Sequence, residues 1–158
     1  MYKAIIVLQG RVKSSRLPAK GFFSFYGETI WARMCKIANS CTFAEKVIFA
    51  TGKSDDNFLA ESIARDAGVE FLVGSESNVY DRFCKVSKEY PSEFIVRVTC
   101  DNYLVQPELL EAIFNLVQSQ NADYGFIEPL SHYGGEIIRS KLFDNFKNPS
   151  KKAKEHVT

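Results

Sequence analysis

The fold is decided by the stretch Lys3-Ala4-Ile5-Ile6-Val7-Leu8 and by the polar connection behind it, Gln9-Gly10-Arg11-Val12-Lys13-Ser14-Ser15-Arg16-Leu17-Pro18-Ala19-Lys20. A short, continuous apolar run predicts a strand that is buried on both faces, as strands of parallel sheets are. The run is too short for a signal peptide, and no small-residue cleavage site follows it. We therefore interpret it as a first buried strand and expect a cytoplasmic protein.

Short apolar runs alternate with helical patterns along the rest of the chain. The further predicted strands are Lys46–Ala50, Val69–Val73, Phe94–Val98 and a weaker Asp123–Ile127, and Ile137–Phe146 is predicted to mix strand and helix. The predicted helices are Glu28–Ser40, one between an N-cap at Ser54 and a C-cap at Gly68, one capped by Ser77, and Pro107–Asn121. This alternation predicts a mostly parallel sheet with helices on both faces, whose ligands bind beyond the carboxyl ends of the strands.

Composition and charge limit the classes of protein to which this sequence can belong. The 158 residues, 46% hydrophobic and 25% charged, suit one globular domain, which we place at residues 1–146, with a mobile tail at 147–158. The net charge of +1 predicts no nucleic-acid binding through bulk charge, and no apolar run is long enough to span a membrane. The four cysteines show no CxxC spacing, which favours free thiols over a zinc site or a disulfide.

The connection after the first strand is strongly basic. Residues 11–20 hold four cations and no acid, and Ser14 and Ser15 add neutral donors. Cations at this density repel one another, so a bound anion is their simplest stabilising partner. A solvated basic loop and a nucleic-acid patch remain alternatives, and the segment matches neither the P-loop nor the GxGxxG pattern.

Gly10–Lys20 resembles the signature loop of the sugar cytidylyltransferases, which make CMP-activated acidic sugars, and it is most similar to the SpsF type of spore coat polysaccharide biosynthesis. Three further blocks are similar in order and spacing: Val47–Thr51 with Asp55-Asp56, Gly74–Phe83, and Arg97–Asp101 with Pro107-Glu108-Leu109. The resemblance implies a Rossmann-like three-layer α/β/α fold with a mostly parallel sheet, of the nucleotide-diphospho-sugar transferase or GT-A-like kind. The final Glu155-His156-Val157-Thr158 resembles a segment that continues in the family, so we expect a shortened chain.

The same resemblance implies a reaction and its residues. CMP would move from CTP to a sugar acid acceptor in surface polysaccharide or glycan precursor synthesis, with release of pyrophosphate. Catalytic roles would fall to Arg11, Arg16, Lys20 and Asp101, and nucleotide contacts to Gly10, Ser14, Ser15, Thr51, Arg82 and Thr99. The family also implies a homodimer. This chain departs from the family at Lys13 and Cys100, where glycine is usual, and at Asn102, Tyr103 and Gln106.

Asp101 is the main candidate metal ligand. It follows a predicted strand directly, and Mg²⁺ prefers oxygen ligands and keeps several waters. A second carboxylate is offered by Glu136, because the preceding Gly134 and Gly135 let the backbone approach a ligand. A turn or cap role for Asp101 and an exposed turn role for Glu136 are the alternatives.

The remaining polar candidates each have a structural alternative. Arg82 would reach the nucleotide or a sugar carboxylate, or else pair with Asp81 or Glu76. Arg97 lies inside an apolar strand and is expected to pair with a nearby acid. Thr51 and Thr99 end strands, where base or ribose contacts and simple turn roles are both open. His132 and His156 form no convincing catalytic dyad.

Two other functions compete with the transferase. A truncated or degenerate nucleotide-binding or assembly module is suggested by Lys13, Tyr103 and the early stop. A GT-A glycosyltransferase would share the sheet topology, but Asp101-Asn102-Tyr103 lacks the second acid of the DxD motif.

Overall fold

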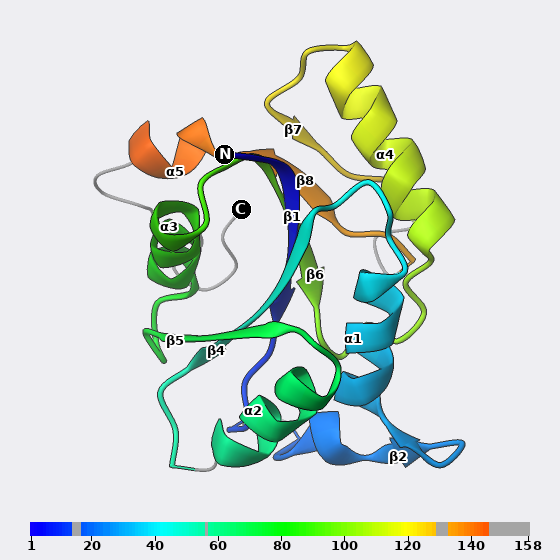
Figure 1. Ribbon diagram of the computed structural model, residues 1–158, viewed down its shortest axis with the longest axis vertical. Helices are drawn as coiled ribbons and strands as arrows, with labels where there is room; N and C mark the ends of the chain where they lie inside the picture. Colours follow the sequence, from blue (N-terminus) through cyan, green and yellow to red (C-terminus); the bar gives the residue numbers. More distant parts are fainter. Residues whose placement is uncertain (14–16, 56, 129–132, 146–158) are drawn as a thin grey trace.

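The computed structural model describes residues 1–13, 17–55, 57–128 and 133–145, and its centre is a six-stranded sheet (Figure 1). The strands are β1 (Tyr2–Gln9), β4 (Lys46–Gly52), β5 (Glu70–Gly74), β6 (Ser92–Thr99), β7 (Tyr124–Gly125) and β8 (Glu136–Arg139). Their order is β5-β4-β1-β6-β8-β7. β1, β4, β5 and β6 run parallel, whereas β8 is antiparallel to β6 and to β7. The predicted mostly parallel sheet is confirmed.

Helices cover both faces of this sheet. One face carries α1 (Ile30–Asn39), α2 (Asn57–Asp66) and α4 (Pro107–Ser119), and the other carries α3 (Val79–Glu89) and α5 (Lys141–Asn145). Alternate residues of β1 serve the two cores: Ala4, Ile6 and Leu8 pack on the first side, Ile5 and Val7 on the second. Burial on both faces explains why β1 is continuously apolar in sequence.

The strand order reverses direction beside β1. The chain passes from β1 outward to β4 and β5 and then returns across β1 to form β6. The carboxyl ends of β1 and β6 therefore lie side by side, with Gln9 opposite Thr99. Open α/β sheets bind ligands in the crevice at such a switch point.

Several predicted boundaries were wrong. α1 begins at Ile30 rather than Glu28, because Thr29 caps it by accepting a hydrogen bond from the Ala32 backbone N–H at 3.2 Å. Residues 24–29, of which Glu28 and Thr29 were assigned to that helix, form a small hairpin of β2 (Ser24–Phe25) and β3 (Glu28–Thr29), after a 3₁₀ turn η1 (Lys20–Phe22).

The N-cap of α3 also differs from the prediction. The cap of α3 is Asn78, whose side chain accepts from the Asp81 N–H at 3.2 Å, and not Ser77. α2 begins at Asn57, and Gly68 takes the left-handed φ of 68° expected after its end. The weak strand 123–127 shrinks to Tyr124–Gly125, while the strand and helix predicted within 137–146 are present as β8 and α5.

The cysteine prediction is confirmed, since Cys35, Cys41, Cys84 and Cys100 are all free thiols. Within the described ranges, no helix has the length and apolar character needed to cross a bilayer. The tail predicted to be mobile, residues 147–158, lies outside the described residues.

Candidate functional site

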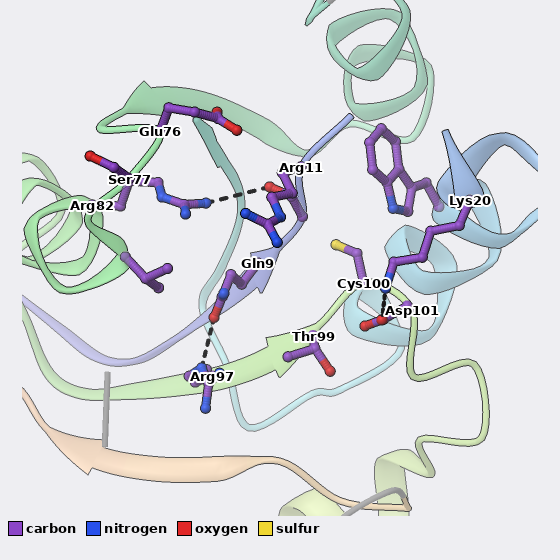
Figure 2. Close-up of a pocket in the computed structure, with 13 residues that line it drawn as sticks. Gln9, Arg11, Lys20, Glu76, Ser77, Arg82, Arg97, Thr99, Cys100 and Asp101 are labelled. Carbon is purple, nitrogen blue, oxygen red and sulfur yellow. Dashed lines mark hydrogen bonds and ion pairs between the residues drawn. The ribbon is translucent and has the colours of Figure 1, made fainter. Parts of the chain in front are cut away.

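A cavity of about 450 Å³ opens at the carboxyl ends of β1 and β6, where the strand order switches (Figure 2). Its lining comes from five parts of the chain: Gln9, Gly10 and Arg11; Lys20 and Trp31; Glu76, Ser77 and Val79; Arg82; and Arg97, Thr99, Cys100 and Asp101. This lining holds four cationic side chains and two carboxylates. The cavity is therefore suited to an anionic ligand.

The described parts of the basic loop, before residue 14 and after residue 16, are held in place by contacts near Val12 and Lys20. Val12 is buried, and its carbonyl accepts a hydrogen bond from the N–H of Ala19 at 3.1 Å. Gly21 lies against the indole of Trp31, where a Cβ atom on residue 21 would come within 1.9 Å of the ring. Only glycine permits this approach, which holds the neighbouring Lys20 over the cavity.

Lys20 forms an ion pair with Asp101 across the cavity mouth (Figure 2). Burial acts to raise the pKa of Asp101, but the hydrogen bond and positive charge of Lys20 outweigh it and hold that pKa below its usual value. The Asp101 side chain keeps 42% of its surface exposed. An ionised, accessible carboxylate thus faces the same space as the basic loop.

Arg82 extends from α3 into the cavity and is almost completely buried, with 1% of its surface exposed. Gly74 makes room for it, because a Cβ atom at residue 74 would lie 2.5 Å from Arg82 Cγ. The guanidinium donates one long hydrogen bond, from Nη1 to the Gly10 carbonyl at 3.5 Å, and Nε has no partner among the described residues. The predicted alternative, an ion pair with Asp81 or Glu76, is not formed within that part of the chain.

The surroundings of Arg82 disfavour its charge. Burial lowers the pKa of the guanidinium; Glu76 acts in the opposite direction, and the charges of Arg11 and Arg97 lower it further. A buried cation without a close counter-ion is costly, and an anionic ligand would remove that cost.

Arg97 is held between two neighbouring strands. Its Nε donates to Gln9 Oε1 at 2.8 Å, and its Nη1 donates to Glu136 Oε1 at 2.8 Å. The expected pairing of Arg97 with an acid is therefore confirmed, and the partner is the carboxylate that the sequence offered as a second metal ligand. Glu136 does not line the cavity.

The cavity brings together six of the predicted site residues: Gly10, Arg11, Lys20, Arg82, Thr99 and Asp101. Thr51 instead lies buried at the end of β4, outside the cavity lining. Ser14, Ser15 and Arg16 lie outside the described residues, as do His132 and His156. The functional role of each of these residues stays a prediction.

Seven further lining residues were not among the predicted site residues: Gln9, Trp31, Glu76, Ser77, Val79, Arg97 and Cys100. Gln9 gave one usable signal, since it is the polar residue that directly ends a buried strand before a glycine. Trp31 gave none, because its spacing is that of an ordinary core residue of α1.

Across the described residues, no group of three or more His, Cys, Asp or Glu side chains is arranged to hold a metal ion. Of the two carboxylates that line the cavity, Asp101 is the one that pairs with a cation of the basic loop, and its pKa is held below the usual value. One carboxylate fits Mg²⁺ when phosphate oxygens and water supply its other ligands.

The chain belongs to the cytidylyltransferase family, whose model matches residues 4–155. The spore coat polysaccharide biosynthesis protein SpsF of Bacillus subtilis is 28% identical over 148 residues, which cover 90% of this chain and 61% of that protein. The chain therefore spans about three fifths of the length of this curated relative.

Solved structures agree on the fold. A cytidylyltransferase from Leptospira borgpetersenii superposes with a TM-score of 0.89 at 24% identity, over 99% of this chain and 69% of that one. A CMP:2-keto-3-deoxy-manno-octonic acid synthetase complexed with CTP gives 0.76 at 15% identity, over 95% and 80%. The fold is that of the nucleotide-diphospho-sugar transferases, as the sequence predicted.

Proposed function

We propose that the protein is a cytidylyltransferase that transfers CMP from CTP to the hydroxyl of an acidic sugar and releases pyrophosphate, in surface polysaccharide or glycan precursor synthesis. The observation that supports this most is the meeting of Arg11, Lys20, Arg82 and Asp101 around one cavity at the switch point. Family membership and a neighbour that holds CTP agree with it.

In the proposed reaction the acceptor hydroxyl oxygen bonds to the α-phosphorus of CTP. The bond from that phosphorus to the oxygen bridging to the β-phosphate breaks, pyrophosphate takes the bonding electrons, and the hydroxyl proton passes to solvent. Negative charge grows on the phosphate oxygens during this step. Arg11 and Lys20 would bind and orient the triphosphate, with Arg16 and the two serines completing the loop, and fixed cations of this kind stabilise such charge.

Mg²⁺ would be held by Asp101, with the remaining ligands from phosphate oxygens and water, and when bound it would neutralise charge on the phosphates. Lys20 holds the Asp101 carboxylate in the ligand-free arrangement. Because Arg97 occupies Glu136 Oε1, a metal at that second predicted ligand would compete with an existing ion pair.

The test is pyrophosphate release from CTP and MgCl₂ with 3-deoxy-manno-octulosonate or N-acetylneuraminate as acceptor, together with calorimetric titration by CTP alone. We expect CTP to bind and release to be abolished by Lys20→Met. Lys88→Met, which removes an exposed lysine from α3, is the matched control. A wild-type protein that binds no CTP would refute the proposal.

The second candidate function is that of a nucleotide-binding or assembly module, which has the same fold but does not catalyse CMP transfer. It is favoured by the engagement of both candidate metal carboxylates, Asp101 by Lys20 and Glu136 by Arg97. It predicts CTP binding without pyrophosphate release from any acidic sugar. Turnover with a single acceptor would exclude it.

A further inference from the structure

The α3-facing side of the sheet changes from apolar to polar near the carboxyl ends of its central strands. Ile5 and Val7 of β1, Ile95 of β6 and Ile138 of β8 belong to the core beneath α3 and α5. Strand alternation places Gln9, Arg97 and Glu136 on this same face. These three side chains form a hydrogen-bonded row, which we call the Gln9–Arg97–Glu136 network.

The Gln9–Arg97–Glu136 network fixes the orientation of the Gln9 amide. A guanidinium has only N–H donors and no acceptor, so the group that receives Arg97 Nε–H must be the carbonyl oxygen of Gln9. The alternative amide rotamer would set two donors against each other. The ion pair with Glu136 holds the guanidinium at 2.8 Å from the other side, and the Arg97 side chain is only 10% exposed. Gln9 Oε1 is thus directed to Arg97, and Nε2 is directed away from it.

The Nε2 group of Gln9 is placed to meet a ligand. Gln9 lines the cavity at the switch point, opposite Thr99 and directly before Gly10. Gln9 is half-buried, its amide makes one hydrogen bond within the described ranges, the one received by Oε1, and Nε2 is not among the buried side-chain atoms of those ranges that lack a partner. The two N–H donors of Nε2 therefore remain available on the cavity side.

We propose that Gln9 is a nucleotide-binding residue of this cytidylyltransferase, that it donates Nε2–H to an acceptor oxygen of CTP, and that Arg97 and Glu136 are positioning residues for that donor. The inference rests on the proposed function. CTP is the favoured source of the acceptor, because β1 and β6 meet at the switch point where such sheets bind nucleotides. The adjoining Arg82 and Arg11 draw the same anionic ligand to this side of the cavity.

Two substitutions at residue 9 separate hydrogen bonding from packing. Gln9→Glu keeps an acceptor for Arg97 and replaces Nε2 with an anionic oxygen, so the fold is retained while the donor is lost. Gln9→Met removes the donor without adding charge. Loss of a hydrogen bond to a charged ligand predicts about a tenfold or greater weakening of CTP affinity in both variants. Gln118→Glu makes the same chemical change on α4, away from the cavity, and is the matched control.

The positioning role is tested by a double-mutant cycle measured by calorimetric titration with CTP. Arg97→Met removes the group that orients Gln9. We therefore expect Gln9→Met to weaken CTP binding far less in the Arg97→Met background than in the wild type, whereas independent structural roles would give additive effects. Glu136→Gln keeps an acceptor for Arg97 and is expected to restore most of the affinity lost in Glu136→Ala.

The outcomes separate the two proposals. A wild-type protein that fails to bind CTP refutes the proposed function, and this inference with it. Wild-type binding with unchanged affinity in Gln9→Glu and Gln9→Met refutes the inference alone. Weakened binding in both residue-9 variants, with additive effects in the cycle, supports the Gln9 contact and refutes the positioning role of Arg97. Circular dichroism melts establish that each variant is folded.

Discussion

Arg82→Met is expected to stabilise the ligand-free protein while it weakens nucleotide binding. The Arg82 residue is 1% exposed, its Nε has no partner among the described residues, and its hydrogen bond to the Gly10 carbonyl is 3.5 Å long. Methionine keeps an unbranched apolar stem of similar shape and carries no charge to desolvate. The substitution therefore removes a cost from the folded state.

The magnitude follows from what surrounds the guanidinium. Even where a buried ion pair is given up, replacement by apolar side chains of similar volume is often neutral or stabilising by about 1–4 kcal/mol, and Arg82 has no ion pair to lose among the described residues. Glu76 favours the charge of Arg82 and offsets part of this cost, whereas Arg11 and Arg97 add to it. We expect the free energy of unfolding to rise by about 1–3 kcal/mol, with Tm rising about 2–4 °C for each kcal/mol. CTP affinity should fall about tenfold or more, because a desolvated charge contact is lost.

Urea denaturation without nucleotide and calorimetric titration with CTP measure the two effects. Arg139→Met is the matched control, because Arg139 is also largely buried but forms ion pairs with Glu93 at 2.9 Å and Asp123 at 2.8 Å. In Arg139→Met the free energy of unfolding should fall by about 1–2 kcal/mol, a small value because Glu93 and Asp123 are half-exposed, and the CTP affinity should be unchanged. An Arg82→Met protein that is destabilised and binds CTP normally would refute the reasoning, since Arg82 would then be a structural residue.

Three further predictions concern single groups. Asp101→Asn should lower the rate of pyrophosphate release about a hundredfold or more, taking one lost electrostatic contact of about 3 kcal/mol as the guide, and an unchanged rate would exclude a catalytic role. Because Lys20 holds the pKa of Asp101 below the ordinary 3.8, this carboxylate contributes stability above that pH, and the contribution is lost as pH falls through the lowered value. Urea denaturation from pH 6 to about pH 2 should therefore show a steeper acid loss in the wild type than in Asp101→Asn, and parallel curves would contradict it. Burial raises the pKa of Cys35 to about 12 and, with nearby acids adding to it, that of Cys41 to about 11, so both thiols should resist iodoacetamide at about pH 8 until urea unfolds the chain. Rapid alkylation of either thiol in the folded protein would contradict this.

The sheet was predictable because its central strands are buried on both faces. A continuous apolar run such as residues 4–8, bounded by polar residues and too short for a buried helix, indicates such a strand. The β2–β3 hairpin was not predictable in this way, because its strands are two residues long and too short for any alternation. Its turn has a φ of 52° at Tyr26 and of 80° at Gly27, and of these two residues only the glycine gives a turn signal in the sequence. Ser77 and Asn78 are adjacent capping residues, and only the backbone geometry selects Asn78.

The cavity was predictable in part for a related reason. Carboxyl ends of parallel strands share one edge, so the segments after the first and fourth strands had to approach each other once the strand order was known. The hydrogen-bond partners of buried groups could not be predicted from the sequence. Gln9 and Glu136 lie 88 and 39 residues from Arg97 and meet it only through the register of the strands. The lack of an ion pair at Arg82 within the described part of the chain likewise depends on tertiary packing, since it is set by the side chains that lie beneath α3 on its face of the sheet.

The central claim is that the basic loop and the turn after β6 enclose one nucleotide site. A crystal structure of the protein grown with CTP and MgCl₂ tests it most directly. We predict the triphosphate against Arg11 and Lys20, with Asp101 at the metal and the nucleoside in the cavity that Gln9 and Arg82 line. A nucleotide bound elsewhere on the protein, with the Lys20–Asp101 ion pair intact, would contradict the claim.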